Sequence, residues 1–413
     1  MRVAGRSLTI LVLLIIITVP AAVLRVLCVG RSCEREARGR QSVPFCSLPR
    51  DIRSLIVAGY QEGRSPDVLA VGEPTPLSAR VAFAANGLRG PGSEIEIGLD
   101  DIAPTMANIL RFDIPHPEVR SGKAATEVTT ERPPRLVLLA VFKNLDQQQE
   151  MNVPGAAGRE PLVGTAAMIS LPLDPTALLA TIGTGGTPAQ HGVTGSHLRN
   201  DQGRLVRAWS GDAFPGTVIA TLADDLDEAL VQTPKIGLVG TSRIDQGLVG
   251  GDWYVDVDRD LRRFVDDSES AVDQARSLMR SERFGRDDVT DLLVVSVDAS
   301  NLDVNDALAT LDEMARRVSG GDAALVTVGL PAGEPGEELI DMQEVVRHVE
   351  NETARGVVEE AALGGLFLDQ EVLVDNGVTK DQVVSALRSA TQDGRRVFAD
   401  VFPGIAVSFA RFC

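Results

Sequence analysis

The sequence predicts an α/β protein built as a three-layer sandwich, with helices on both faces of a mostly parallel central sheet. Apolar strand-like runs alternate with helical patterns along the chain, as in parallel α/β sheets. Several of these runs are continuous Val, Leu and Ala sequences, which is typical of strands buried on both faces. The composition agrees, because 44% hydrophobic and 24% charged residues are usual for a globular protein. The 413 residues suit one large domain or two smaller ones.

The predicted elements follow from these patterns in chain order. The predicted strands are Val68–Val71, Arg80–Ala84, Arg135–Val141, Lys235–Val239, Leu292–Val297, Ala323–Val328 and Ala406–Ala410. The predicted helices, which place apolar residues at three- and four-residue spacing, are Thr217–Val231, Val304–Val318 and Lys380–Ala390. The polar stretch Arg120–Pro134 contains paired prolines and predicts a linker or an exposed loop.

The amino terminus predicts one membrane-spanning helix. Arg2 and Arg6 precede the apolar run Leu8–Leu24, which would reach about 26 Å as a helix. No good cleavage site follows, so we expect an uncleaved anchor within residues 1–30 and a polar linker over residues 31–49. The two arginines favour a single-pass protein of the cell membrane whose carboxyl-terminal part is extracytoplasmic, although Arg25 and Arg31 on the far side of the run reduce this asymmetry. A cleaved signal peptide and a secreted protein are the alternative.

Charge and histidine content exclude several classes of function. The formal net charge of -18 argues against nucleic acid as a partner. The four histidines, His116, His191, His197 and His348, form no Asp-His pair, His-x-His or His-Glu-x-x-His group. No CxxC pair is present either, so we predict no metal site.

The cysteines are expected to pair if the chain is exported. They are Cys28, Cys33, Cys46 and Cys413. A bridge from either Cys46 or Cys33 to Cys413 would tie the two ends of the chain together.

Three segments together resemble a known family. Thr184–Val193 (TGGTPAQHGV) is similar to the TG-x-x-P-x-x-HG-I stretch of the type I phosphodiesterase and nucleotide pyrophosphatase branch of the alkaline phosphatase superfamily. Asp101–Met106 (DIAPTM), with the prolines that follow it, resembles a D-I-A-P-T segment near the carboxyl end of that domain. Asp291–Val318 running into Ala323–Val328 resembles a strand, helix and strand of the family.

The order of these segments implies a circular permutation. The family's late segment, Val68–Pro117, precedes its early segments, Arg135–Gly195. The resemblance therefore implies a single permuted alkaline-phosphatase-like domain over residues 50–413, with new termini that lie close together. On this interpretation Cys46 and Cys413 are neighbours and form a disulfide. The rival interpretation is two domains divided near Arg120–Pro134.

The family's metal ligands do not carry over to this sequence. The first strand ends in Phe142-Lys143-Asn144 where the family has a metal-binding Asp, and Gly329-Leu330-Pro331 replaces the Asp-His pair. The late His is replaced near Thr75-Pro76-Leu77. Three weak catalytic candidates remain: Thr176 for the nucleophile, Asp298 for a ligand, and His191, which in the family belongs to a structural turn.

The resemblance therefore implies a membrane-anchored, extracytoplasmic and non-catalytic domain that binds or scaffolds in the cell envelope. Its partner would be an envelope protein or ligand, and it would need no cofactor. Because ligands of parallel sheets bind at the carboxyl ends of strands, the expected ligand cleft is rimmed by Asn144, Thr184, Gly185, Asn301 and Gly329. The alternative is an active metal-dependent phosphodiesterase or phosphatase whose Zn or Mn site is rearranged around Asp298, Asp303, Asp306 and His191.

Overall fold

The computed structural model describes residues 44–72, 77–91, 94–251, 253–254, 259–332 and 340–413. The expected membrane segment, residues 1–30, lies outside these residues. Among the helices that are described, none has the length and apolar character needed to cross a membrane.

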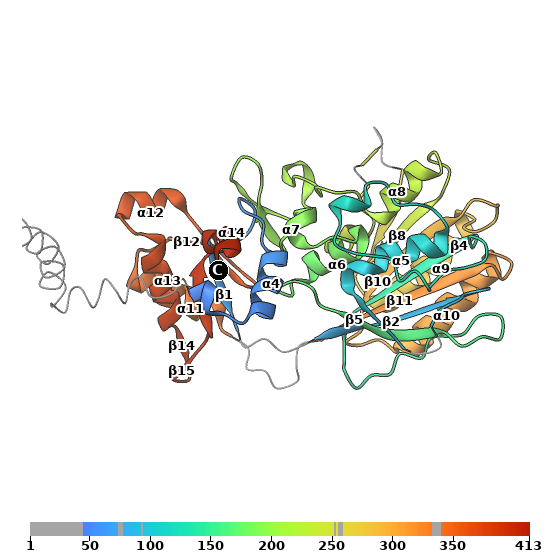
Figure 1. Cartoon of the computed structure of the whole chain (residues 1–413), viewed down its shortest axis with the longest axis horizontal. Coiled ribbons are helices and arrows are strands. Elements are labelled where there is room, and N and C mark those ends of the chain that lie inside the picture. Colours follow the sequence, from blue (N-terminus) through green and yellow to red (C-terminus); the bar gives the residue numbers. More distant parts are fainter. Residues whose placement is uncertain (1–43, 73–76, 92–93, 252, 255–258, 333–339) are drawn as a thin grey trace, which may run out of the picture.

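The described chain forms two bodies, each with its own sheet (Figure 1). The larger body, residues 77–332, contains an eight-stranded sheet in the order β3-β5-β2-β11-β4-β10-β8-β9. The smaller body, residues 44–72 and 340–413, contains a four-stranded sheet in the order β12-β13-β1-β16. The strands of the larger sheet are β2 (Ser78–Ala85), β3 (Ile95–Gly98), β4 (Leu136–Leu145), β5 (Leu162–Ala167), β8 (Ile236–Gly240), β9 (Leu261–Phe264), β10 (Asp291–Asp298) and β11 (Ala323–Pro331).

The central sheet is mostly parallel, as the sequence predicts. Within it β2 runs antiparallel to both neighbours, whereas β11, β4, β10, β8 and β9 pair in parallel. Alternate residues of β4 enter different cores, with Leu139 on one face and Leu138 on the other. Helices α5 (Ile102–Leu110), α6 (Pro175–Thr184) and α8 (Leu222–Ala229) pack on the first face, and α9 (Ser268–Ser281) and α10 (Val304–Val318) pack on the second.

The smaller body is an antiparallel sheet covered by helices. Its strands are β1 (Val68–Val71), β12 (Val358–Ala362), β13 (Gly365–Leu368) and β16 (Asp400–Pro403). Its helices are α3 (Pro44–Ser47), α4 (Arg50–Gly59), α11 (Met342–Glu352), α12 (Gln370–Asn376), α13 (Lys380–Ser389) and α14 (Ile405–Ser408). The predicted strand Val68–Val71 is therefore present, but it belongs to this antiparallel sheet and not to a parallel one.

Short elements complete both bodies. They are α7 (Pro188–His191), the hairpins β6 (His197–Arg199) with β7 (Leu205–Arg207) and β14 (Thr391–Gln392) with β15 (Arg395–Arg396), and the 3-10 helices η1 (Leu99–Asp101), η2 (Pro117–Val119), η3 (Gly211–Ala213), η4 (Arg243–Leu248) and η5 (Ala410–Phe412).

Two predicted elements differ from the structure. Ala406–Ala410 is wrong as a strand, because Ala406 and Val407 are buried side by side in a helical turn of α14. The predicted helix Thr217–Val231 begins late, at Leu222, because the hydroxyl of Thr221 accepts a bond from the Asp224 amide and caps it.

Arg120–Pro134 forms an irregular loop with many exposed residues, as predicted, but it is not a linker between the bodies. The Arg120 guanidinium lies 2.6 Å from the Asp225 carboxylate, with both side chains buried. Val128 joins the core of the larger body. This segment therefore packs on the larger body, and the chain passes between the bodies after Gly72 and after Ala332 instead.

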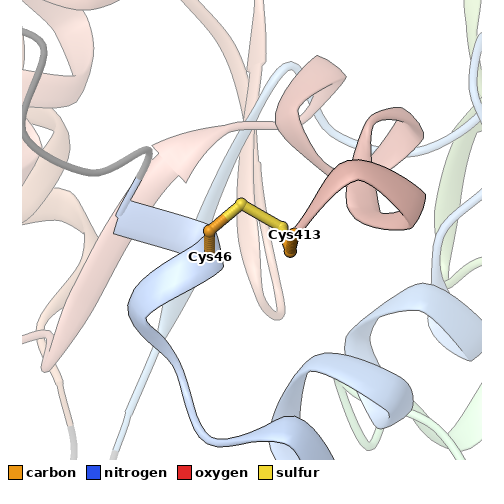
Figure 2. Close-up of a disulfide and its surroundings, with 2 residues drawn as sticks. All are labelled: Cys46 and Cys413. Atoms are coloured by element: carbon orange, nitrogen blue, oxygen red, sulfur yellow. A yellow bond between two sulfur atoms is a disulfide. The ribbon is translucent and has the colours of Figure 1, made fainter.

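The Cys46–Cys413 disulfide implied by the resemblance is confirmed (Figure 2), and the two Cα atoms lie 5.2 Å apart. It joins α3 to the end of the chain. Phe45 is fully buried against Phe402, with ring centroids 5.3 Å apart. Residues 44–49, at the end of the expected polar linker, are thus folded into the smaller body.

Candidate functional site

The carboxyl ends of the central strands hold a buried ion pair. Lys143, near the end of β4, places its Nζ 2.5 Å from Oδ1 of Asp245 in η4. The side chains are 9% and 0% exposed. Strand carboxyl ends are where parallel sheets bind ligands, so this pair occupies the region where a functional site is expected.

Further hydrogen bonds close this network. Ser296 of β10 donates its hydroxyl to the same Asp245 oxygen at 2.8 Å, and the Ser242 amide donates to the other at 2.9 Å. Lys143 Nζ also lies 3.4 Å from the hydroxyl of Thr241. Because each charge has close polar partners, the cost of burying them is offset. The network links the carboxyl ends of β4, β8 and β10.

Asp298 lies beside this network. It is the register partner of Lys143 across β4 and β10, and Asn144 donates its side-chain amide to Asp298 at 2.7 Å. The Ser300 amide donates to the other carboxylate oxygen at 2.9 Å. Partial burial acts to raise the pKa of Asp298, but the bonds from Ser300 and Asn144 and the Lys143 charge hold it below its ordinary value. Asp298 is therefore an ionised, hydrogen-bonded acceptor.

A pocket of about 230 Å³ opens at the carboxyl ends of β4 and β11. It is lined by Leu77, Ser78, Arg80, Leu145, Asp146, Gln147, Thr165, Gly329 and Pro331. The Arg80 guanidinium donates to the carbonyls of Gln147 and Gln149. Of the five predicted cleft residues, Gly329 lines this pocket, and a Cβ there would lie 2.4 Å from the Leu145 side chain.

Thr184 and Gly185, also predicted for the cleft, lie in a packed turn. The Thr184 hydroxyl donates to the Ala180 carbonyl at 2.7 Å, and Gly185 ends α6 with φ of +72°. The Gly185 carbonyl accepts a bond from the Gly122 amide at 3.0 Å, and a Cβ on Gly185 would lie 3.0 Å from Pro104 of α5. The two family-like segments, TGGTPAQHGV and DIAPTM, therefore pack against each other.

His191 stabilises the same turn through hydrogen bonds of both ring nitrogens. The Val193 amide donates to its Nδ1 at 3.1 Å, so its Nε2 carries the proton and donates to the Thr181 hydroxyl at 3.1 Å. Complete burial, with a smaller effect of the Arg64 charge, lowers the pKa of His191 to about 3. A neutral imidazole with both nitrogens bonded inside the fold has a structural role.

The remaining candidates are not brought together. Thr176 is 1% exposed at the start of α6, where its amide donates to Asp174 at 2.8 Å. Asp303 caps α10 by accepting the amides of Asn305 and Asp306, and Asn301 is exposed in the preceding turn. Throughout the part of the chain that the structure describes, no three His, Cys, Asp or Glu side chains are grouped so that they could hold a metal ion.

Sequence reasoning missed the partners of Lys143. The sequence places Lys143 at the end of a predicted strand, because it follows the apolar run Arg135–Val141. Asp245 lies 102 residues away in a 3-10 turn, and Ser296 lies inside a continuous apolar strand. Neither carries a local signal, so the pairing emerges only from the register of β4, β10 and β8.

Comparisons with known proteins give one structural likeness. No family model matches the chain, and no curated protein matches it either. The structure is similar to that of wild-type alkaline phosphatase PafA, with 13% identity and a TM-score of 0.41 over 65% of this chain and 84% of the phosphatase chain.

Proposed function

We propose that the protein is a membrane-anchored, extracytoplasmic domain of alkaline-phosphatase-like type that is non-catalytic and serves binding or scaffolding in the cell envelope. The main observation that supports this proposal is the Lys143–Asp245 ion pair, 2.5 Å apart, at the end of β4. The sequence resemblance predicts a metal-binding carboxylate at this strand end. An ammonium group stands there in its place.

This substitution opposes metal-dependent chemistry. Lys143 neutralises the Asp245 carboxylate, so the pair offers no net negative charge to hold a divalent cation. Asp245 is already engaged by Lys143, Ser296 and the Ser242 amide. Without a cation, the charge that develops in a phosphoryl-transfer transition state lacks its usual stabilisation.

Export is supported by two separate features. The sequence places the apolar run Leu8–Leu24 behind two arginines. The Cys46–Cys413 disulfide is of the kind that persists outside the cytoplasm. We expect the chain to stay in the membranes after alkaline washing. We also expect protease added to spheroplasts to digest its carboxyl-terminal part. Digestion only after lysis would contradict the orientation.

Catalysis is tested by metal content and turnover measured on one preparation. The full chain, purified with its disulfide intact, is exposed to zinc and manganese, desalted and examined by elemental analysis. Hydrolysis of p-nitrophenyl phosphate and bis(p-nitrophenyl) phosphate is then measured. We expect far less than one metal ion per chain and no hydrolysis above that of buffer.

The Asp298→Asn variant is the matched control, because Asp298 is the remaining carboxylate of the family pattern. Turnover that this variant leaves unchanged comes from a contaminating phosphatase. Near-stoichiometric metal together with turnover that Asp298→Asn abolishes would overturn the proposal in favour of an active metal-dependent enzyme.

A further inference from the structure

The last helical turns of the chain carry an exposed apolar stripe. Ile405, Phe409 and Phe412 are 45%, 56% and 69% exposed. Their spacing of four and three residues places them on one side of consecutive helical turns, and the rings of Phe409 and Phe412 lie 6.3 Å apart. Ala406 and Val407 point the other way, into the core of the smaller body. We call Ile405, Phe409 and Phe412 the C-terminal apolar face.

This face lies beside the point where the preceding chain enters the fold. Cys413, next to Phe412, is bonded to Cys46, which lies two residues after Pro44, the first described residue (Figure 2). The disulfide therefore fixes the C-terminal apolar face next to the exit of residues 1–43.

The sequence before Pro44 brings a membrane within reach of this point. Nineteen residues, 25–43, separate the apolar run Leu8–Leu24 from Pro44. A chain of that length spans about 24 Å as a flexible coil and at most about 65 Å when extended. If Leu8–Leu24 is inserted in a bilayer, the face is held at a high effective concentration near its surface.

The charges at this end suit an anionic lipid surface. Residues 25–43 contain five arginines and two glutamates, in contrast to the net charge of -18 for the whole chain. Arg411, exposed between the two aromatic residues, places its guanidinium 4.8 Å from the centroid of the Phe412 ring. Glu62, which accepts a 2.7 Å bond from Ser408, is an opposing charge nearby. Basic segments next to a membrane anchor are attracted to anionic headgroups.

We propose that the C-terminal apolar face rests in the headgroup region of the bilayer that holds the amino-terminal anchor, with anionic lipid as its partner. This inference rests on the membrane anchoring in the proposed function. Apolar side chains flanked by a basic residue bind at the boundary between headgroups and acyl chains. Three side chains form a small face, so binding depends on the tether. The contact would set the orientation of both bodies above the membrane.

Quenching by brominated lipid measures this contact in the full chain. The chain is reconstituted into vesicles of phosphatidylcholine containing phosphatidylglycerol as the minor anionic lipid, with or without brominated acyl chains. Phe412→Trp places an indole in the face, and the unsubstituted chain gives the background from Trp209 and Trp253. Val374→Trp is the matched control, since Val374 is 79% exposed on α12, a helix that is not part of the C-terminal apolar face.

We expect bromine to quench the indole of Phe412→Trp several-fold more than that of Val374→Trp, with less quenching when phosphatidylglycerol is omitted. Adding Phe409→Ser should reduce this quenching, and circular dichroism checks that the fold is kept. Equal quenching of the two indoles, or none, would overturn the proposal. Oligomers of the detergent-solubilised chain that Phe409→Ser dissociates would also overturn it, because the face would then bind a second copy.

Flotation of the same vesicles separates this inference from the proposed function. A chain that does not float with vesicles has no anchor, and the proposed anchoring fails with the inference. A chain that floats but shows no bromine quenching at position 412 keeps its anchor and refutes the lipid contact alone.

Discussion

Two regions of the larger body differ in how closely they match the family pattern. They are the turn Thr184–Val193 and the carboxyl ends of β4, β8 and β10. The turn keeps the family-like pattern, and its side chains bond within the fold: Thr184 to Ala180, and His191 to Thr181. The strand ends depart from the pattern, and Lys143 with Asp245 stands where the resemblance predicts metal ligands.

This difference separates two kinds of constraint on a residue. Gly185 is required by its backbone, because it has a positive φ and lies close to Pro104 whatever the protein does. A charge at a strand end is constrained by its partner, so it can be exchanged when the partner is exchanged with it. The conformation of the turn therefore follows from the fold, whereas the charges at the strand ends depend on their partners.

The largest expected effect comes from breaking the ion pair at the strand ends. Lys143→Met leaves the Asp245 carboxylate buried without its cation, and we expect a loss of about 3–5 kcal/mol in the free energy of unfolding. Urea denaturation of the wild type and the variant at neutral pH measures it. Lys143→Met combined with Asp245→Asn removes both charges and should recover a large part of the loss. A loss below about 1 kcal/mol for the single variant would show that the pair is not a structural replacement for a ligand site.

Much of the larger body was predictable because its strands are continuous apolar runs. β4, β8, β10 and β11 were all placed within a few residues of their bounds, and Val304–Val318 matches α10. The smaller body was missed apart from β1 and α13. The other strands of its four-stranded sheet have four or five residues each, and β13 and β16 pair with β1 across long separations, as in Leu366 with Val68. Such strands are stabilised by distant partners rather than by local pattern.

The site was predictable only as a location. Asn144, Asp298 and Gly329 do lie at the carboxyl edge of the sheet, as parallel topology requires. Thr184 and Gly185 were expected there because the resemblance implies that their loop rims a cleft at the carboxyl ends of the strands. Their contacts with α5 and Gly122 are tertiary, and no feature of the local sequence distinguishes a packed turn from an open one.

A second prediction concerns His191 and the pH dependence of stability. His191→Gln should lower the free energy of unfolding by about 1–3 kcal/mol at neutral pH, because Thr181 and the Val193 amide lose a buried partner. The folded-state pKa of His191 is about 3, below the unfolded value of about 6.5. The unfolded wild type therefore binds more protons between these values, and His191 makes it lose stability as the pH falls through this window.

The variant lacks this loss, so the stability difference between the two proteins should shrink between about pH 6.5 and pH 4, by up to about 1.4 kcal/mol per pH unit, and approach zero or reverse its sign near pH 4. Urea denaturation of both proteins across this range tests it, and the other titrating groups cancel in the difference. A difference that stays constant with pH would mean that the imidazole is protonated inside the fold and that the turn is more open than the structure indicates.

The smallest expected effect tests whether the turn is packed on α5 or simply needs a positive φ. Gly185→Ala combines both costs, since φ is +72° and the new Cβ would lie 3.0 Å from Pro104 Cδ and 3.3 Å from the Asp100 carbonyl. Gly203→Ala is matched to it, with φ of +74° and no atom within 4 Å. We expect Gly203→Ala to cost about 1 kcal/mol of unfolding free energy and Gly185→Ala about 2 kcal/mol, measured by urea denaturation. Equal losses would show that the contact between the TGGTPAQHGV and DIAPTM segments contributes little, and the turn would then owe its glycine to backbone conformation alone.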